Sequence, residues 1–518
     1  MEEKYILSFD IGTTTIKSGL VDASDFSVKY KKSIEAEIMY PRPGWAEIDP
    51  HALWNQILEL SQSIIDESKV DTNNVLGLIY TAHMAGVIPI DKVGNPLMNM
   101  IIWLDERAAG LPRDIWVGFP KLAGYNLFKL ISFLRVTGGA PSKTGKDPIS
   151  KILWIRKNEP DVYNNARYFL DVKGFLIYKS TGNAVTSHDE ASLTWLADTR
   201  YGEAVWYKPF FKKYNLDVNT FPKILDSTAV AGRLTREASS ELNLPENLPV
   251  IVGSGDLTSA AVGSGAIKEG EPHIYIGTSD WIAAHIKSRK VDVFHYIGSL
   301  FSGIPRRYLL IAEQEVAAGA LEWAMDILGI GKGDYNKVRE LVESTPVGSN
   351  NLVFFPWLYG ERSPIDDPYV RGVLMNFSFT HSKGDILRSI MEGVAYNIRW
   401  AYNYFEKLVG KWDLITIVGG GALFDVWCQV VSDVLGINLK RIKDPHDAGL
   451  RGIATIAAVG LGIYKSFEDA VSRYKVDKIF KPIEENNKTY SKLYDRYIEF
   501  YKKNKKIFRH LNLHQHIM

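Results

Sequence analysis

The chain has 518 residues, 46% of them hydrophobic and 23% charged, a globular composition with room for about two to four domains that excludes a largely disordered protein. Lysine and arginine number 61 against 60 aspartates and glutamates, so the net charge of +1 excludes a global field that could hold nucleic acid. The single cysteine, Cys428, excludes an internal disulfide framework and a cysteine-rich zinc module, and it suits a reducing compartment.

The N-terminal segment lacks the pattern of a secretory signal. Its first residues, MEEKYILSFD, place two acidic side chains where such a signal needs a basic region. No segment reaches the roughly 18 consecutive apolar residues of a membrane-spanning helix. We therefore expect a soluble, cytoplasmic protein with neither a membrane nor a nucleic-acid partner.

The first 22 residues predict a β-hairpin that turns on a loop rich in glycine and threonine. Residues 5–9 form one apolar strand, Asp10 and Gly12 break it, and residues 16–21 form the second strand. Glycine allows a phosphate group to approach backbone N–H groups closely. The loop therefore offers such donors together with an acid, Asp10, for a metal ion or its bound water.

Residues 135–151 (RVTGGAPSKTGKDPISK) are rich in glycine, proline, serine and lysine. This composition predicts a long surface loop, and we expect it at the mouth of a ligand site.

Asp256 stands between an apolar strand and a helix. Residues 249–252 form the strand, Gly253 and Gly255 follow, and residues 258–265 form a helix of small side chains. A carboxylate there is equally an ordinary helix N-cap or a general base that accepts a hydroxyl proton during phosphoryl transfer.

The second half of the chain begins as the first half does. Residues 273–276 and 280–286 predict strands on either side of the turn Gly277-Thr278-Ser279, and the strand at 414–418 is followed by a third glycine-rich turn at 419–422. Each turn alone would also suit an ordinary connection between strands. Together they predict two α/β domains with a boundary near residue 250 and helices such as 385–409 in the second.

The tail from residue 486 onward is basic. It holds eight lysines and arginines against Asp495 and Glu499, and Tyr490, Tyr494 and Tyr497 recur with Tyr501 at helical spacing. The pattern predicts one amphipathic helix that docks its tyrosines and exposes its lysines, with a nucleic-acid arm as the disfavoured alternative.

The chain resembles the FGGY family of carbohydrate kinases, which have two actin/Hsp70-like (ribonuclease H-like) ATPase domains of the α/β class with a cleft between them. The resemblance implies an N-terminal sugar kinase domain at 1–250, a C-terminal nucleotide-binding domain at 251–485 and a basic helical tail at 486–518. It rests on seven segments in family order: FDIGTTTIK (9–17), PGWAEIDPHALW (43–54), GNPLMNMIIWLDERA (94–108), GSGDLTSAAVGSGA (253–266), YIGTSDW (275–281), YGERSPIDDPYVRG (359–372) and VGGGALFDVWCQVVSDVLG (418–436).

The resemblance also implies which residues bind ATP and Mg²⁺. Asp10 would hold the magnesium ion through water, and Asp256 would be the catalytic base. The residues that would contact the ATP phosphates are Thr13, Thr14, Thr15, Gly277 and Thr278. Those that would border the adenosine are Gly420, Gly421 and Asp425. The sugar would lie between the domains beside His83, Met84, Trp103, Asp105, Arg107 and Asp256.

The substrate is the least defined part of this prediction. Xylulokinases are the nearest in pattern and favour a ketopentose such as D-xylulose, but Ala85 and Leu257 stand where those enzymes have a histidine and an asparagine that bind their sugar. His83 and Lys151 could bind the sugar instead. A gluconate, glycerol or other polyol kinase stays open, with glycerol disfavoured by Met84-Ala85, as does a nucleotide-gated sugar-binding protein that transfers nothing. A homodimer is the candidate assembly.

Overall fold

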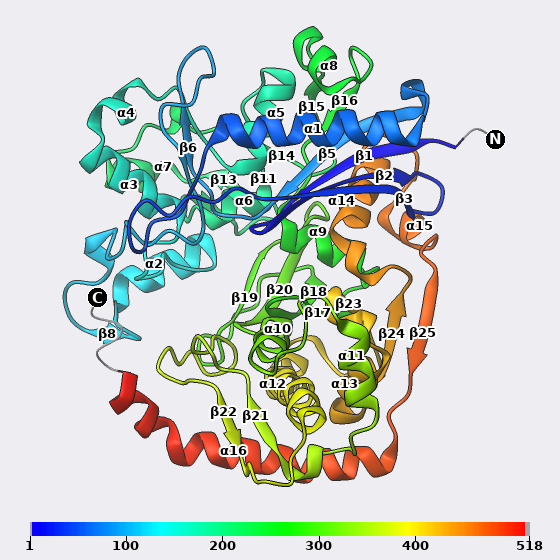
Figure 1. The fold of residues 1–518 in the computed structure, drawn as a ribbon. Coiled ribbons are helices and arrows are strands. Elements are labelled where there is room, and N and C mark those ends of the chain that lie inside the picture. Colours follow the sequence, from blue (N-terminus) through cyan, green and yellow to red (C-terminus); the bar gives the residue numbers. More distant parts are fainter. Residues whose placement is uncertain (1–2, 513–518) are drawn as a thin grey trace.

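The computed structural model describes residues 3–512, so residues 513–518 of the predicted tail lie outside the part described. The chain forms two halves, each built around one large β-sheet (Figure 1). The predicted α/β class with two sheet-bearing domains is confirmed.

The first sheet has six strands. β1, β2 and β3 are antiparallel neighbours, whereas β5 runs parallel to β1 and β16 parallel to β5. The predicted hairpin at residues 5–21 is confirmed as β1 and β2. In spatial order the strands are β15 (Val230–Arg233), β16 (Pro249–Ile251), β5 (Val75–Ala82), β1 (Tyr5–Ile11), β2 (Thr15–Asp22) and β3 (Val28–Glu35).

The second sheet repeats this pattern with seven strands. β17, β18 and β20 are antiparallel neighbours, whereas β23 runs parallel to β17 and β24 parallel to β23. The strands predicted at 273–276, 280–286 and 414–418 are confirmed. In spatial order the strands are β19 (Ile297–Phe301), β20 (Tyr308–Gln314), β18 (Asp280–Ile286), β17 (Pro272–Ile276), β23 (Leu414–Val418), β24 (Asn438–Ile442) and β25 (Val476–Phe480).

Short strands and sixteen α-helices of the described residues complete the two halves. The short strands are β4 (Glu47–Ile48), β6 (Ile88–Ile90), β7 (Met100–Ile101), β8 (Lys121–Leu122), β9 (Tyr125–Asn126), β10 (Tyr168–Leu170), β11 (Val185–Ser187), β12 (Ala197–Asp198), β13 (Val205–Trp206), β14 (Lys223–Leu225), β21 (Val353–Phe355) and β22 (Val373–Met375). The helices are α1 (Pro50–Ser68), α2 (Leu127–Thr137), α3 (Pro148–Asn158), α4 (Pro160–Asn165), α5 (Val172–Thr181), α6 (His188–Leu193), α7 (Lys208–Tyr214), α8 (Arg236–Leu242), α9 (Asp256–Gly263), α10 (Ala318–Ile327), α11 (Tyr335–Glu343), α12 (Lys383–Val409), α13 (Asp425–Leu435), α14 (Ala448–Gly460), α15 (Phe467–Val471) and α16 (Glu484–Asn512).

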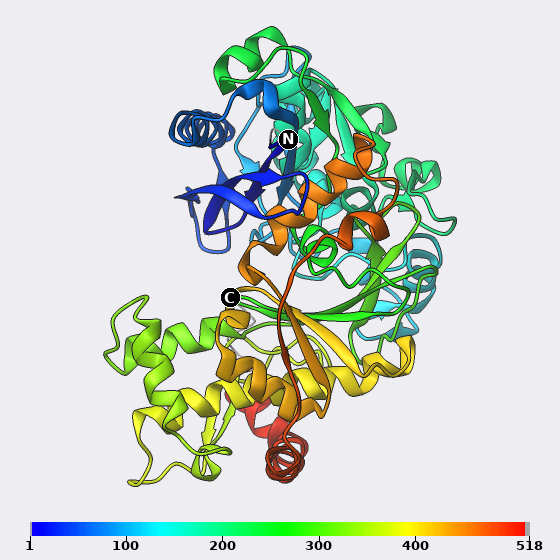
Figure 2. The same ribbon diagram turned by 90° about the vertical axis from the view of Figure 1, so that its right-hand side faces the viewer.

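The first sheet is covered on both faces, which is why β1 and β5 are almost continuously buried. Leu7 and Phe9 of β1 pack in one cluster with α1 and α5. Ile6 of β1, on the other face, packs with Ile453 and Ile456 of α14. Helix α14 belongs to the late part of the sequence, yet it lies beside the N-terminal strands, as Figure 2 shows in orange and blue.

The segment at 135–151 differs from its prediction as one long loop. Residues 135–137 end α2 and residues 148–151 begin α3, so only residues 138–147 lie outside helices. The helix begins there because Asp147 stands at the N-cap position and Pro148 at the first turn, where proline loses no hydrogen bond. As a result Lys151 is fully buried rather than displayed on a surface loop.

The tail forms the predicted amphipathic helix, α16, which lies along the lower edge of the C-terminal half (Figure 1). Tyr490, Tyr494, Tyr497 and Tyr501 are all buried, and they pack in the main cluster of that half with α12 and β21. The predicted docking of the aromatic stripe is confirmed.

Candidate active site

Asp10 lies near the end of β1, where the chain turns into β2. Its Oδ2 is 3.9 Å from Nζ of Lys17, and a Cβ on Gly449, at the start of α14, would lie only 2.8 Å from that oxygen. Burial raises the pKa of Asp10, Lys17 lowers it, and Asp447 raises it further. Glycine at position 449 thus leaves room for an acid at the N-terminus of a helix, where the dipole favours the anion.

Asp256 is the first residue of α9, directly after β16. Gly255 holds the N-cap position, so the N-cap alternative predicted for Asp256 is wrong by one residue. Its Oδ1 accepts a 2.8 Å hydrogen bond from the N–H of Leu257. Burial, and then the negative charges of Asp10 and Glu313, raise the pKa of Asp256 to about 7. A carboxyl group in this range can accept a proton near neutral pH.

The parallel strands β1, β5 and β16 bring these residues to one edge of the sheet, because parallel strands end on the same side. Oγ1 of Thr81, at the end of β5, donates to the carbonyl of Ser254 at 2.8 Å and lies 3.0 Å from Oγ of Ser259 in α9. Met84, two residues beyond β5, fills the space over Gly255, where a Cβ would meet its Cγ at 2.4 Å.

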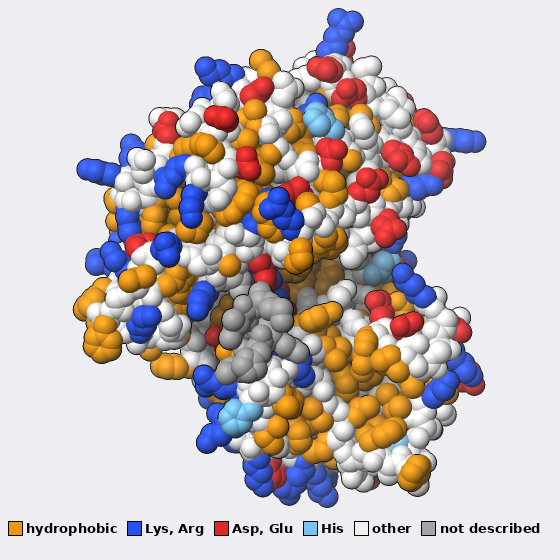
Figure 3. All heavy atoms as spheres, turned by 60° about the vertical axis from the view of Figure 1, so that its left-hand side comes forward, with side chains coloured by type: hydrophobic (Ala, Val, Ile, Leu, Met, Phe, Trp, Pro, Cys, Tyr) orange, Lys and Arg blue, Asp and Glu red, His pale blue; other side chains and the backbone are white. Residues whose placement is uncertain are grey.

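The glycine-rich turns of the second half face this edge. Tyr275 stacks on Trp281 at 3.9 Å, and the charges of Asp10 and Asp256 add to burial in raising the pKa of Tyr275, so both acids lie within electrostatic range of β17. In the turn after β17, the N–H groups of Ala317 and Gly319 donate to the carbonyl of Thr278. Figure 3 shows the molecule hollowed between its two halves.

The third turn, after β23, lies against the second. A Cβ on Gly421 would lie 2.3 Å from Cγ2 of Ile276, at the end of β17, whereas one on Gly420 would meet nothing within 4 Å. Gly420 is therefore open to a ligand. Asp425 begins α13 and is paired with Arg441 at 2.7 Å and Lys478 at 2.6 Å.

Two of the residues predicted for different ligands contact one another. Nε1 of Trp103, predicted beside the sugar, donates to Oγ1 of Thr13 at 2.9 Å, in the loop predicted beside phosphate. Thr14 is exposed at the tip of that loop, and Thr15 begins β2. The contact joins a residue predicted to lie beside the sugar to the loop predicted to lie beside the phosphates.

Arg107 and Asp105 are engaged with the N-terminal half itself. Arg107 donates to Asp105 and, at 2.7 Å, to Glu47, and its guanidinium lies 3.6 Å from the ring of Trp45. Its side chain is 1% exposed, and Asp105 is fully buried. All of these contacts lie within the N-terminal half, so both residues are already bound by other side chains there.

His83 and Lys151 form a second polar group near Met84. Nζ of Lys151 donates to the carbonyl of Ala85 at 2.7 Å, and burial lowers its pKa to about 7. Burial and the nearby Lys151 lower the pKa of His83 to about 4, and both of its ring nitrogens lack a hydrogen-bond partner among the described residues. A neutral imidazole and a lysine with spare N–H groups are suited to bind hydroxyl or carboxylate oxygens.

Sequence reasoning missed a charged cluster on the opposite wall. Arg362 binds Glu315 at 2.5 Å and Glu313 at 2.6 Å, at the end of β20, and Glu313 raises the pKa of Asp256. Arg362 lies in the segment YGERSPIDDPYVRG, which carries the family resemblance but does not indicate a charged cluster. No spacing in the sequence links residue 362 to residues 313 and 315.

The site thus combines an acid with a pKa near neutrality, a second acid beside it, and glycine-rich turns from both halves. This arrangement suits a phosphotransferase that moves a phosphoryl group from a nucleotide to a hydroxyl group. Among residues 3–512 no group of three metal-binding side chains is arranged around one point. Asp10, next to an open turn, is still a fitting outer ligand for a hydrated divalent ion.

The chain belongs to the FGGY family of carbohydrate kinases: the model of the N-terminal domain matches residues 5–263 and that of the C-terminal domain residues 273–461. It is similar to the xylulose kinase of Staphylococcus epidermidis, at 28% identity over 510 residues and 98% of each chain, and to the glycerol kinase of Saccharolobus islandicus, at 28% over 499 residues and 93% of each. The structure is similar to gluconate kinase from Lactobacillus acidophilus, with a TM-score of 0.85, 23% identity, and coverage of 97% of this chain and 99% of that one.

The family confirms the predicted enzyme class, an ATP-dependent carbohydrate kinase with an actin-like ATPase fold. Within residues 3–512, no helix is both long enough and apolar enough to cross a membrane.

Proposed function

We propose that the chain transfers the γ-phosphate of ATP to a hydroxyl group of a ketopentose such as D-xylulose, with Asp256 as the general base. The observation that carries this proposal is the position of Asp256 at the start of α9, at the same sheet edge as a second acid, Asp10, and burial there raises the pKa of Asp256 to about 7. The base takes the proton of the attacking hydroxyl as the oxygen forms its bond to the γ-phosphorus and ADP leaves in line.

Asp10 would hold Mg²⁺ through water. The ion would offset the charge of the phosphates, while Thr13, Thr14, Thr15, Gly277 and Thr278 would supply N–H and hydroxyl donors. Gly420 and Gly421 would border the adenosine, and Asp425 would contribute there by holding the start of α13. Closure of the two halves would exclude water and direct the phosphoryl group to the sugar.

The sugar would lie on the side of Trp103, His83 and Met84. Support for a ketopentose comes from the xylulose kinase relative, which aligns over 98% of the chain. Asp105 and Arg107 would act on the sugar indirectly, because Arg107 already binds Glu47. Their mutual ion pair would fix the shape of this side of the sugar site. His83, whose two ring nitrogens have no partner among residues 3–512, would bind a sugar hydroxyl that the apolar side chain of Ala85 cannot bind.

A second candidate is an aldonate such as gluconate, and one observation favours it. Lys151 lies close enough to His83 to lower its pKa, and the only partner it binds through Nζ in the described structure is the carbonyl of Ala85. A protonated Lys151 could therefore bind a substrate carboxylate. The chain shares the fold of gluconate kinase, but this similarity supports only the fold and not the substrate.

A coupled assay of ADP release over ketopentoses, aldonates, glycerol and other polyols tests the proposal. We expect D-xylulose to give the highest kcat/KM. A higher kcat/KM with gluconate would establish the second candidate. In that case Lys151→Met should lower kcat/KM for gluconate more than kcat/KM for D-xylulose. If no substrate stimulated ADP release, the chain would be a nucleotide-gated binding protein and the proposal would be wrong.

A further inference from the structure

The loop between β21 and β22, residues 356–372, contacts the end of β20, where Glu313 pairs across the sheet with Trp281 of β18. It carries Arg362, whose Nε and Nη2 bind Glu315 at 2.5 and 3.1 Å and whose Nη1 binds Glu313 at 2.6 Å. The N–H of Ser363 also donates to the carbonyl of Glu313 at 3.0 Å. Because Glu313 acts electrostatically on Asp256, the arginine neutralises negative charge opposite the proposed base.

The buried side chain of Glu361 holds this loop in place. It is 3% exposed, and its Oε1 accepts from the backbone N–H groups of Glu315 and Arg362, both at 2.9 Å. Its Oε2 accepts from Nδ2 of Asn397, in α12, at 2.6 Å. The backbone of Glu361 also pairs with that of Asp367 in both directions, at 3.0 and 2.8 Å. The buried side chain of Glu361 therefore helps to position Arg362, together with the backbone pair to Asp367.

The C-terminal helix α16 holds the same network. Oη of Tyr497 donates to Oδ1 of Asn397 at 3.2 Å, and Oη of Tyr501 donates to Oδ2 of Asp367 at 3.3 Å. Near the end of the described chain, Nδ2 of Asn512 donates to the carbonyl of Tyr369 at 2.9 Å. Three residues of one helix thus reach the loop, directly or through Asn397.

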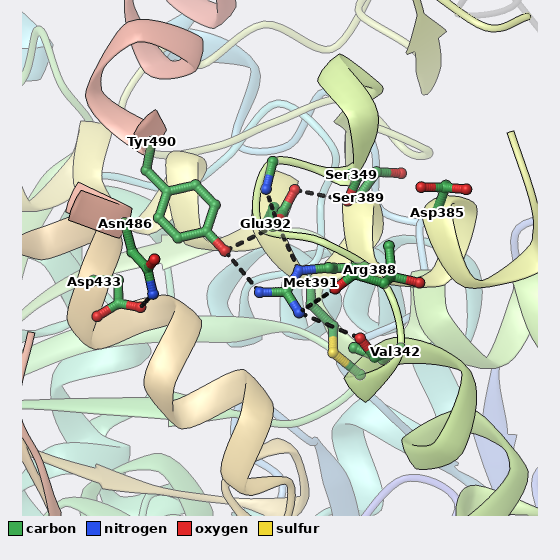
Figure 4. A network of polar contacts seen from close by, with 12 residues as sticks. Val342, Ser349, Asp385, Arg388, Ser389, Met391, Glu392, Asp433, Asn486 and Tyr490 are labelled. Atoms are coloured by element: carbon green, nitrogen blue, oxygen red, sulfur yellow. Dashed lines mark hydrogen bonds and ion pairs between the residues drawn. The ribbon is translucent and has the colours of Figure 1, made fainter. Parts of the chain in front are cut away.

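The start of α16 is anchored on α12 by a buried ion pair, drawn in Figure 4. Arg388 binds Glu392 at 2.9 Å, and Oη of Tyr490 donates to Glu392 at 2.9 Å while it accepts from Arg388 at 3.1 Å. Both charged residues belong to α12, so the two hydrogen bonds of Tyr490 are the contacts here that join α16 to the pair, and α16 cannot slide along α12 without breaking them.

We infer that α16 is a brace for the active site, which positions Arg362 against Glu313 and Glu315 through Tyr497, Asn397 and Glu361. The inference rests on the proposed phosphoryl transfer. Tyr497 and Asn397 are positioning residues, because both are buried behind the loop. The basic face of the helix takes no part in this role, which belongs to the tyrosine stripe.

Two matched variants test the inference. Tyr497→Phe removes the hydroxyl but keeps the ring that stacks on Phe355. Tyr494→Phe is its control. Oη of Tyr494 accepts a hydrogen bond from Asn403 of α12 at 3.0 Å, so this bond, like that of Tyr497, joins a tyrosine of α16 to an asparagine of α12. Within the described chain, the hydrogen bond and the ring contacts of Tyr494 all go to α12 rather than to the loop.

The first measurement is steady-state kinetics with the best sugar from the substrate panel. We expect Tyr497→Phe to lower kcat/KM for the sugar about threefold to tenfold, as for the loss of one hydrogen bond, with the KM for ATP unchanged. Tyr494→Phe should match the parent in kcat/KM for the sugar and in KM for ATP. We expect the two variants to lose similar thermal stability. Arg362→Met should lower kcat/KM for the sugar at least as much as Tyr497→Phe.

The second measurement is hydrogen–deuterium exchange of residues 356–372, which needs no substrate. We expect faster exchange in Tyr497→Phe and unchanged exchange in Tyr494→Phe. Equal effects of the two variants on kinetics and exchange, or parent-like activity of Arg362→Met, would overturn the brace. If the parent phosphorylated no sugar, the proposed function would fail, while the exchange comparison would still decide whether α16 holds the loop.

Discussion

At the scale of single residues, the site depends on two carboxyl groups that repel one another. Asp10 and Asp256 are brought together at one sheet edge, and the charge of Asp10 helps to raise the pKa of Asp256. Both acids are also partly desolvated, which disfavours their anions in the absence of a cation. The protein therefore holds an arrangement that a divalent ion and substrate would relieve.

Asp256→Asn should abolish phosphoryl transfer and raise stability at neutral pH. The raised pKa means that the folded chain keeps a proton which the unfolded chain releases above about pH 4, so this group destabilises the fold as pH rises from about 4 to 7. Asparagine keeps the acceptor for the N–H of Leu257 and removes the penalty, by about 1–2 kcal/mol after allowance for partial exposure.

Thermal melts of parent and Asp256→Asn at about pH 8 and pH 4.5, with the ADP assay, check this prediction. The variant should melt higher than the parent at the upper pH and by a smaller margin at the lower. A variant that still phosphorylated sugar at the parent rate would remove Asp256 from its role as base.

The pH dependence of kcat/KM gives a separate prediction. A general base must be deprotonated, so kcat/KM for the sugar should rise with pH through about 7 and then level off. Asp10 and Glu313 both raise the pKa of Asp256, so Glu313→Gln should move this rise to lower pH. Profiles between about pH 5.5 and 9 measure the midpoints. A flat parent profile, or a midpoint moved upward in the variant, would contradict the assignment.

At the scale of elements, the sequence predicted those parts that local patterns define. Both glycine-turn hairpins and the strand before Gly419 were found within two residues, because apolar strands stop sharply at glycine. The amphipathic tail was found because tyrosines at helical spacing have one buried face. The segment at 135–151 was missed because its glycines outweighed the helix start at Asp147-Pro148.

The same distinction holds for the site. Asp10 and Asp256 could be singled out as candidates because each follows an apolar strand and precedes or lies beside glycine. The charged residues that surround them in the folded chain could not be predicted from the sequence. Glu313 and Arg362 meet only when β20 and the loop at 356–372 fold together, and the ion pair of Arg107 with Glu47 joins segments 60 residues apart. Contacts of this kind leave no periodic trace in a sequence.

At the scale of the whole molecule, the two halves are joined where α9 crosses α14. A Cβ on Gly263 of α9 would lie 1.8 Å from the carbonyl oxygen of Ala448, and one on Gly452 of α14 would lie 1.8 Å from that of Ser259. The backbones of the two helices therefore touch, which only glycine permits. Asp256 begins one helix, and Gly449 in the first turn of the other lies beside Asp10, so this crossing helps to set the distance between the two acids.

Gly452→Ala should therefore disturb both stability and catalysis. The added methyl group must push the helices apart, at a cost of about 1–3 kcal/mol, and this displaces Asp256 relative to Asp10. Gly298→Ala, in β19, is the control, because a Cβ there meets nothing within 4 Å. Thermal melts and kcat with the best sugar should fall for the first variant and stay near the parent for the second. Parent-like values for Gly452→Ala would mean that the helices yield easily, and the spacing of the acids would then have to be set by the sheet edge alone.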